Sequence, residues 1–278
     1  MTDDFFLSMP RRKLLAGLGA AAMGGVASSV VGQAATARAQ ESKSSAVVPS
    51  ICVFDVNGSL LDTDALAPLF KRLFGDGLVE REWYEELALY SNVITSSGNY
   101  PGTFFELAKA VLQMVGSIHH VEIRPADIEE LGTRLLSLPA YPDVPDGLRM
   151  LKEAGFRLVT LTNSPPGSKG SETQLARAGI ADFFERHFNT HSVRRFKVAQ
   201  SVYHMVAEEM DVPPTACCMI TAHAWDALGA QYVGFSAGLM NRPGQASLVM
   251  HGLPQPLAVA QDLPGVAAQL IKLRRRQS

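Results

Sequence analysis

The hydrophobic and polar positions of the chain follow two rhythms, one after the other. Between Asp64 and about Ser137, apolar side chains recur at intervals of three and four residues, the spacing of amphipathic helices. Segments that contain glycine and proline interrupt this pattern, so it predicts several helices. The apolar faces include Leu66, Leu69, Phe70 and Leu73, then Trp83, Leu87 and Tyr90, then Leu107, Val111 and Met114.

Outside that stretch, short apolar runs alternate with helical patterns. Repeated strand–helix units predict an α/β fold, in which helices cover both faces of a parallel sheet. Functional groups in such folds gather at the carboxyl ends of the strands. The expected strands are 51–54, 156–162, 188–192, 217–222 and 233–240, and the expected helices around them are 146–154, 171–178, 199–210, 225–232 and 266–273.

The N-terminus has the pattern of an export signal. Arg11-Arg12-Lys13 precedes an uncharged stretch, 14–31, and Ala37-Arg38-Ala39 supplies a small-x-small cleavage site. The paired arginines and the Gly/Ala-rich stretch resemble a twin-arginine signal, although Pro10 and Leu14 depart from that motif. We therefore expect recognition by the twin-arginine export machinery, cleavage near Ala39 and a periplasmic location. The alternatives are an uncleaved membrane anchor or a mispredicted start.

These patterns divide the chain into five parts. We expect a signal peptide at 1–39, a polar linker at 40–50 and a basic, solvated tail at 274–278. The α/β core takes 51–63 and 139–273, and the helical stretch at 64–138 is inserted into it.

Charge and cysteine content narrow the possible partners. The formal net charge of −2 argues against a nucleic-acid partner held by bulk electrostatics. The chain has three cysteines without metal-ligand spacing, all within apolar runs, which favours buried thiols. A disulfide from Cys52 to Cys217 or Cys218 is permitted in an oxidising compartment but is not required.

Polar side chains follow four of the expected strands. They are Asp55, the pair Thr162 and Asn163, Lys197, and the run from Thr221 to Asp226. Parallel strands end at one edge of a sheet, so these distant positions should converge. A carboxylate, a hydroxyl, an ammonium and a second carboxylate can support displacement through a covalent ester. Lys197 would hold Asp55 ionised, and Asp226 would pair with Lys197 or position a water.

Four segments carry a resemblance to a known family. The run from Phe54 to Asp62 resembles the first motif of the haloacid dehalogenase superfamily, Leu161-Thr162-Asn163-Ser164 its second and Arg195-Phe196-Lys197 its third. Thr221-Ala222-His223-Ala224-Trp225-Asp226 is similar to the fourth motif of the type II 2-haloacid dehalogenases. The resemblance covers about 48–273 and implies a Rossmannoid core with a helical cap domain at 64–138.

The residue two positions after Asp55 favours dehalogenation. Phosphatases of the superfamily carry there an aspartate that protonates the leaving alcohol, whereas this chain has Asn57. Expulsion of a halide needs neither that acid nor a magnesium ion, so no cofactor or metal is expected. The resemblance then implies that Asp55 attacks carbon and that water hydrolyses the resulting ester.

The resemblance also assigns roles, position by position. Thr162 and Asn163 would bind the substrate carboxylate, Lys197 would neutralise the nucleophile, and Ser59 would hydrogen-bond near it. The resemblance further implies that Thr221, His223 and Asp226 order the water. Trp225 would form the pocket wall, and Tyr203 would contact the substrate in the site. Family members often dimerise, so a homodimer is possible.

Two positions depart from the family pattern. Tyr84 follows Trp83 where the dehalogenases carry a halide-binding arginine, and a phenol can donate one hydrogen bond but lacks the charge. His223 replaces an asparagine; it could orient water or act as a base, or it could simply pack in the wall. These changes suggest an altered leaving group or substrate, or weak dehalogenase activity.

We therefore predict hydrolytic dehalogenation of short-chain 2-haloacids, which are small anions, to 2-hydroxyacids. Asn57, Tyr84 and Trp225 are expected beside the substrate. The alternatives are a magnesium-dependent phosphatase on the same fold and a catalytically reduced periplasmic protein that binds small carboxylates.

Overall fold

The computed structural model describes residues 48–165 and 171–276. These residues belong to one compact unit. The predicted signal peptide, its cleavage site near Ala39 and most of the predicted linker lie outside them. Among the described residues, no helix combines the length and apolar character needed to cross a membrane.

A sheet of six parallel strands forms the centre of the unit. The strand order β3-β2-β1-β4-β5-β6 places β1 between β2 and β4. All four residues of β1 are buried, which explains why the sequence shows a continuous apolar run there rather than alternation. The strands are β1 (Ile51–Phe54), β2 (Arg157–Thr162), β3 (Arg186–Asn189), β4 (Cys217–Thr221), β5 (Ser236–Met240) and β6 (Ala258–Ala260).

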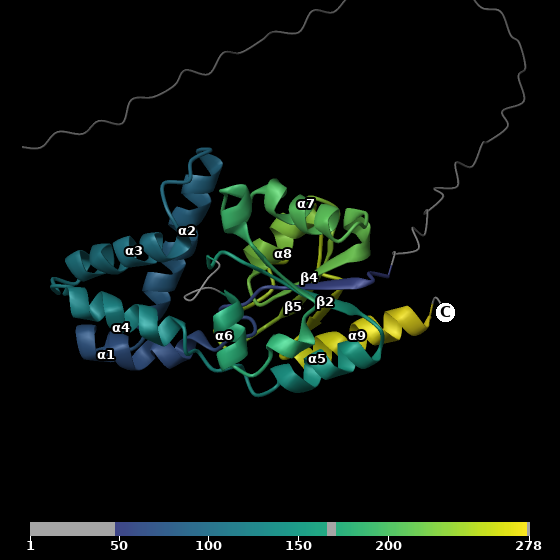
Figure 1. Ribbon diagram of the computed structural model, residues 1–278, viewed down its shortest axis with the longest axis horizontal. Coiled ribbons are helices and arrows are strands. Elements are labelled where there is room, and N and C mark those ends of the chain that lie inside the picture. Colours follow the sequence, from purple (N-terminus) through teal and green to yellow (C-terminus); the bar gives the residue numbers. More distant parts are fainter. Residues whose placement is uncertain (1–47, 166–170, 277–278) are drawn as a thin grey trace, which may run out of the picture. The chain divides into compact units, whose positions relative to one another are not determined.

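Helices cover both faces of this sheet, as predicted (Figure 1). Cys52 and Phe54 point into a core shared with α5 and α9, whereas Ile51 and Val53 point into a second core shared with α7. The alternation of side chains along β1 thus supplies both layers. The helices are α5 (Val144–Glu153), α6 (Ser171–Arg177), α7 (Gln200–Glu209), α8 (Ala224–Gln231) and α9 (Leu263–Arg275).

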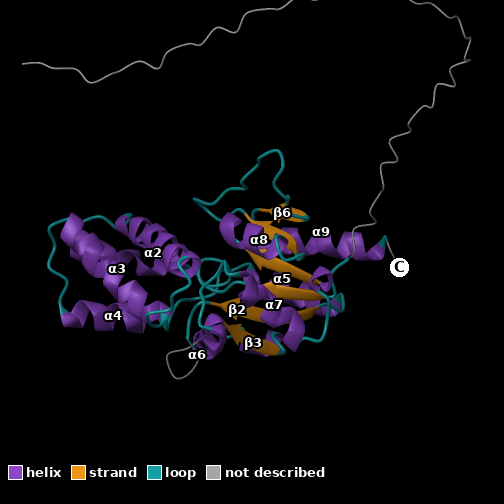
Figure 2. Cartoon of the chain, turned by 90° about the horizontal axis from the view of Figure 1, so that it is seen from above, coloured by secondary structure: helices purple, strands orange, loops and turns teal. Residues whose placement is uncertain are grey.

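Four helices follow β1 and lie together to the side of the sheet (Figures 1 and 2). The chain leaves and returns side by side, since Leu61 forms an antiparallel bridge with Ala140. Trp83 and Phe70 pack with ring centroids 5.4 Å apart between two of these helices. Below we call them the helical cap: α1 (Ala67–Phe74), α2 (Val79–Ser96), α3 (Phe104–Ile118) and α4 (Pro125–Leu135), preceded by a 3-10 turn at Thr63–Leu66.

Two expected elements have different bounds in the structure. The strand expected at 188–192 lies earlier, at Arg186–Asn189, and Thr190–Val193 forms a 3-10 helix. Pairing with β2, in which Arg186 is the register partner of Val159, sets the position of this strand. Because β3 is an edge strand, β2 is the one described strand that it pairs with in the sheet. The strand expected at 233–240 begins at Ser236.

The C-terminal elements also differ from expectation. Helix α9 runs to Arg275, so the basic residues 274 and 275 are helical rather than part of a tail. Arg274 packs over the ring of Phe156 at 4.7 Å, whereas Arg275 is exposed. The three-residue edge strand β6 was not predicted, because Ala258-Val259-Ala260 is too short to show a periodic pattern.

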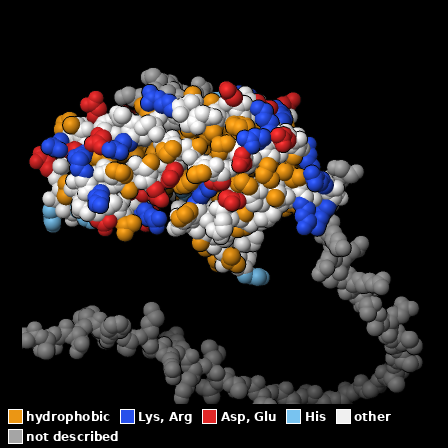
Figure 3. Space-filling view, turned by 90° about the horizontal axis from the view of Figure 1, so that it is seen from below, with side chains coloured by type: hydrophobic (Ala, Val, Ile, Leu, Met, Phe, Trp, Pro, Cys, Tyr) orange, Lys and Arg blue, Asp and Glu red, His pale blue; other side chains and the backbone are white. Residues whose placement is uncertain are grey.

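The three cysteines are free and buried, as favoured by the sequence. Cys52 and Cys218 are register partners on β1 and β4. Burial raises the pKa of the Cys52 thiol well above its ordinary value, which fits an unreactive core residue. On the surface, Figure 3 shows acidic and basic side chains interspersed over the face that it presents.

Candidate active site

Asp55 lies immediately beyond the carboxyl end of β1. Its backbone N–H donates to Ile220 O at 3.0 Å, which fixes the residue beside β4. The chain then turns sharply at Gly58, where φ is +77° and an added Cβ would lie 3.1 Å from the His223 ring. This turn brings Ser59 back to the carboxylate, and Ser59 Oγ donates to Asp55 Oδ2 at 2.6 Å.

Lys197 lies between two buried carboxylates. Its Nζ is 2.9 Å from Asp55 Oδ1 and 2.9 Å from Asp226 Oδ2. Tyr203 Oη donates to the other oxygen of Asp226, Oδ1, at 2.7 Å. The residues predicted at three strand ends therefore meet in one buried hydrogen-bonded chain, Asp55–Lys197–Asp226–Tyr203.

Within this hydrogen-bonded series the pKa values of the two carboxylates shift in opposite directions. Burial alone would raise the pKa of Asp55, but the Lys197 ammonium, His223 and the Ser59 hydrogen bond outweigh it and hold that pKa below its ordinary value. Burial dominates at Asp226, and repulsion from Asp55 adds to it, so the Asp226 pKa is raised. Asp55 is consequently ionised near neutral pH.

Hydroxyl groups fix the loop that follows β4. Ser59 Oγ accepts from Ala222 N at 2.9 Å and lies 3.4 Å from Thr221 Oγ1. Thr221 Oγ1 in turn accepts from His223 N at 3.0 Å. Ser59 thus hydrogen-bonds beside Asp55, as the resemblance implied, and together with Thr221 it holds the β4 loop against Asp55. Thr221 had been expected to order the water.

The residues at the end of β2 hold the backbone at Lys197 in place. Asn163 Oδ1 accepts from the backbone N–H of Lys197 at 3.0 Å, and Thr162 Oγ1 accepts from Ser164 N at 3.2 Å. Thr162 and Asn163 also line the pocket at Asp55. They therefore lie where the sequence placed them, at the carboxyl end of a neighbouring strand.

Three rings stack beside Asp55. His223 lies between Tyr84 and Trp225, with ring centroids 5.5 Å and 5.1 Å away. His223 Nε2 is 3.1 Å from Tyr84 Oη, 3.1 Å from Asn57 O and 3.5 Å from Asp55 Oδ2. Tyr84 comes from α2, so the helical cap contributes a polar group directly to the site.

The Asn57 side chain lines the cavity at Asp55 but bonds to residues other than Asp55. Its Nδ2 donates to Ser164 Oγ at 3.4 Å, and its Oδ1 accepts from Gln174 Nε2 at 3.4 Å. Gln174 gave no signal in the sequence, because a single glutamine on a short helix has no recognisable motif. Ser164 could have been found, since it directly follows the Thr162-Asn163 pair.

A small cavity of about 20 Å³ lies at Asp55 and brings most of the predicted residues together. Tyr203 and Asp226, both fully buried, lie behind Lys197 rather than at this cavity, which corrects the expectation that Tyr203 contacts substrate. The residues that line it are Asp55, Asn57, Tyr84, Thr162, Asn163, Lys197 and Trp225, with Leu87, Ala88, Ser91 and Phe104 from the helical cap.

Comparison with known proteins agrees with this geometry. The sequence profile of haloacid dehalogenase-like hydrolases matches residues 49–234. The chain belongs to this family of hydrolases. The match contains the whole of the Asp55–Lys197–Asp226 arrangement.

Several relatives within the family are haloacid dehalogenases. The chain is 27% identical to (S)-2-haloacid dehalogenase 4A of Burkholderia cepacia over 199 residues, which is 69% of this chain and 83% of that one. It is 33% identical to (S)-2-haloacid dehalogenase of Pseudomonas sp. strain YL over 109 residues, which is 39% of this chain and 46% of that one.

A solved structure shares the fold. L-2-haloacid dehalogenase from Xanthobacter autotrophicus, with chloropropionic acid covalently bound, superimposes with a TM-score of 0.72 at 21% sequence identity. The superposition covers 83% of this chain and 100% of that one. It confirms the predicted α/β fold of this family.

Proposed function

We propose that this protein hydrolyses 2-haloacids to 2-hydroxyacids through an ester on Asp55. The observation that carries the proposal is the buried ion pair between Asp55 and Lys197. Asp55 is held ionised by Lys197, while the residue that serves as an acid in phosphatases is Asn57, with its amide bonded to Ser164 and Gln174. The relatives named above, which are (S)-2-haloacid dehalogenases, support the same chemistry.

In the first half-reaction an Asp55 oxygen attacks the carbon that bears the halogen. The carbon–oxygen bond forms as the carbon–halogen bond breaks, and the halide leaves with the bonding electron pair. Asn163 Oδ1 is engaged by the Lys197 amide, so Asn163 Nδ2 is the donor of that side chain to the substrate carboxylate. Tyr84 Oη lies in the wall of the same cavity and donates to Asn57 O at 3.2 Å; during the reaction it would turn this one proton to the departing halide.

In the second half-reaction water attacks the carboxyl carbon of the Asp55 ester. The hydroxyacid leaves with its original Asp55 oxygen, and the carboxylate regains an oxygen from water. His223 Nε2, which lies 3.5 Å from Asp55 Oδ2, is the group placed to orient that water or take its proton. Lys197 stabilises the carboxylate that is restored.

The site fits a magnesium ion poorly. Both carboxylates that would hold the ion already accept from Lys197 Nζ, at 2.9 Å each. Across the described ranges, no group of three or more His, Cys, Asp or Glu side chains is arranged to hold a metal. These contacts favour dehalogenation over the phosphatase alternative.

Halide release tests the proposal. Purified protein is incubated with each enantiomer of 2-chloropropionate, and chloride is measured with and without EDTA. We expect chloride from one enantiomer, unchanged by EDTA, and none from Asp55→Asn. Phosphate release from small phosphoesters that EDTA abolishes would instead identify a phosphatase. Carboxylate binding without chloride or any covalent adduct would identify a binding protein that does not turn over.

Export and assembly are further parts of the proposal. Twin-arginine export to the periplasm rests on the sequence at 11–39, and a homodimer rests on the family. Export is tested by N-terminal sequencing of protein recovered from a periplasmic extract, and we expect the mature chain to begin near Gln40. The mass in solution by light scattering checks the homodimer.

A further inference from the structure

A second, larger cavity adjoins the cavity at Asp55. It has a volume of about 200 Å³ and lies among α2, α3, the end of α4 and the segment after β2. Four residues, Asn57, Tyr84, Leu87 and Phe104, line both cavities. A group bound at Asp55 can therefore extend into the larger cavity between these side chains.

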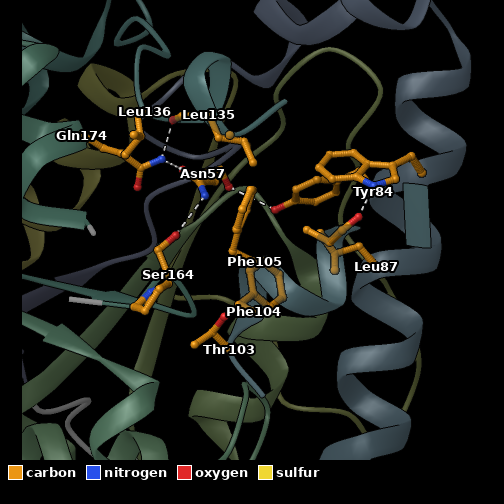
Figure 4. A pocket seen from close by; sticks show the side chains of 14 residues that line it. Asn57, Tyr84, Leu87, Thr103, Phe104, Phe105, Leu135, Leu136, Ser164 and Gln174 are labelled. Carbon is orange, nitrogen blue, oxygen red and sulfur yellow. Dashed lines mark hydrogen bonds between the residues drawn. The ribbon is translucent and has the colours of Figure 1, made fainter. Parts of the chain in front are cut away.

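The wall of the larger cavity is mostly apolar. Its aromatic and aliphatic residues include Trp83, Phe104, Phe105, Leu135 and Leu136, several of which are labelled in Figure 4. The indole N–H of Trp83 is turned to Ala108 O at 3.0 Å and so does not present a donor to the cavity.

The polar groups of the wall are largely paired with one another. Asn57 bonds to Ser164 and Gln174, and Gln174 Nε2 also donates to Leu135 O at 2.6 Å (Figure 4). Gln174 Oε1 is an exception, buried without a partner among the described residues. Apart from this one amide oxygen, the wall is apolar or has its polar groups engaged, so it suits hydrocarbon better than a charged group.

The volume decides what size of group the cavity suits. An engineered apolar cavity of about 150 Å³ is large enough to bind benzene. The methyl group of a 2-halopropionate would leave most of about 200 Å³ unfilled. A linear chain of several carbons or a phenyl ring would fill it and remove the apolar wall from contact with water.

We propose that this cavity receives the substituent on the halogen-bearing carbon, so that the preferred substrates are 2-haloacids with a bulky apolar side chain. The inference rests on the proposed function and narrows its substrate class. The substrate carboxylate would lie at Thr162 and Asn163, and the side chain would pass between Tyr84 and Phe104.

A substrate series measures the effect. The values of kcat/KM are compared for 2-bromopropionate, 2-bromobutanoate, 2-bromohexanoate and 2-bromo-3-phenylpropionate. Burial of each methylene should raise kcat/KM roughly fourfold. We expect 2-bromohexanoate and the phenyl compound to exceed 2-bromopropionate by tenfold or more. Values that stay level or fall along the series would overturn the inference while leaving the dehalogenase proposal intact.

Cavity-filling variants locate the effect. Ala108→Leu fills the cavity from α3, and Leu136→Trp fills it from a half-buried position at the end of α4, which keeps the test available if the first variant fails to fold. Each should lower the ratio of kcat/KM for 2-bromohexanoate over 2-bromopropionate by tenfold or more. Ala110→Leu, at an exposed position on α3, is the matched control and should leave the ratio unchanged.

A binding measurement decides the point if no substrate is turned over. Titration calorimetry compares 3-phenylpropionate with propionate on the intact protein. Tighter binding of 3-phenylpropionate, lost in Leu136→Trp, supports the cavity assignment even where the dehalogenase proposal fails. Equal or weaker binding of 3-phenylpropionate contradicts it.

Discussion

Tyr84 and His223 occupy the two positions where this chain departs from the dehalogenase pattern, and they contact each other. Tyr84 Oη lies 3.1 Å from His223 Nε2 and 3.2 Å from Asn57 O. His223 also stacks on Trp225 with an interplanar angle of 13°. The two departures are therefore one coupled change, in which a phenol and an imidazole share a hydrogen-bond site beside Asp55.

At the scale of single residues, Tyr84→Phe tests the role of the phenol. The ring stack is kept, but the donor to the halide is lost, so kcat/KM for 2-chloropropionate should fall about tenfold, equivalent to one hydrogen bond of about 1.4 kcal/mol. Tyr90→Phe, on the same helix but more exposed, is the control. An unchanged kcat/KM for Tyr84→Phe would show that the phenol does not assist departure of the halide.

At the scale of elements, the sheet was predictable and the loops were not. Asp55 follows β1, and Thr162 and Thr221 are the last residues of β2 and β4. The apolar runs of these strands are visible in the sequence, so the convergence of the three residues could be inferred. Lys197 was expected after a strand at 188–192, but a 3-10 helix at Thr190–Val193 separates it from β3, and its backbone N–H donates to Asn163. Tertiary contacts fix this loop, and periodicity carries no information about them.

The helical cap shows the same limit. Its helices were expected from their apolar spacing, but the residues that it places at the site were not, apart from Tyr84. Leu87, Ser91 and Phe104 line the cavity at Asp55 because of how α2 and α3 pack against the core. Amphipathic spacing identifies a buried face but does not say which partner covers it.

Helix α3 begins with a capping box, which gives a prediction at this scale. Thr103 Oγ1 accepts from Glu106 N, and Glu106 Oε2 accepts from Thr103 N at 2.6 Å. Thr103→Ala should lower the free energy of unfolding by about 1 kcal/mol, measured by urea denaturation. Thr133→Ala is the control, because its hydroxyl bonds only within α4, to Glu129 O. Equal losses in both variants would mean that the cap contributes no stability.

The stability of the whole molecule should depend on a buried acid that the proposed mechanism does not use. Glu80 is 4% exposed, and its Oε1 has no partner among the described residues. It lines a polar cavity of about 90 Å³ together with Arg81, Tyr141 and Arg242. Burial, with repulsion from Asp64, raises its pKa to about 7 despite the attraction of Arg81.

A raised pKa in the folded state predicts a loss of stability as pH rises. The folded protein keeps its proton on Glu80 between pH 4.5 and about 7, where the unfolded chain has lost it, so the contribution is complete below pH 4.5 and lost by about pH 7. The loss should amount to about 3 kcal/mol. Glu80→Gln should flatten this part of the pH profile in urea denaturation, whereas Glu85→Gln, exposed on the same helix, should not. Identical pH profiles for wild type and Glu80→Gln would refute the assignment.

In the proposed mechanism Asp55 forms an ester that water opens at the carboxyl carbon. A single turnover of 2-chloropropionate in 18O-labelled water, with enzyme in excess over substrate, tests this step when the peptide containing Asp55 is analysed by mass spectrometry. We expect one 18O atom to enter the Asp55 carboxylate and the released 2-hydroxypropionate to be unlabelled. Label in the hydroxyacid, with none in the Asp55 peptide, would contradict it.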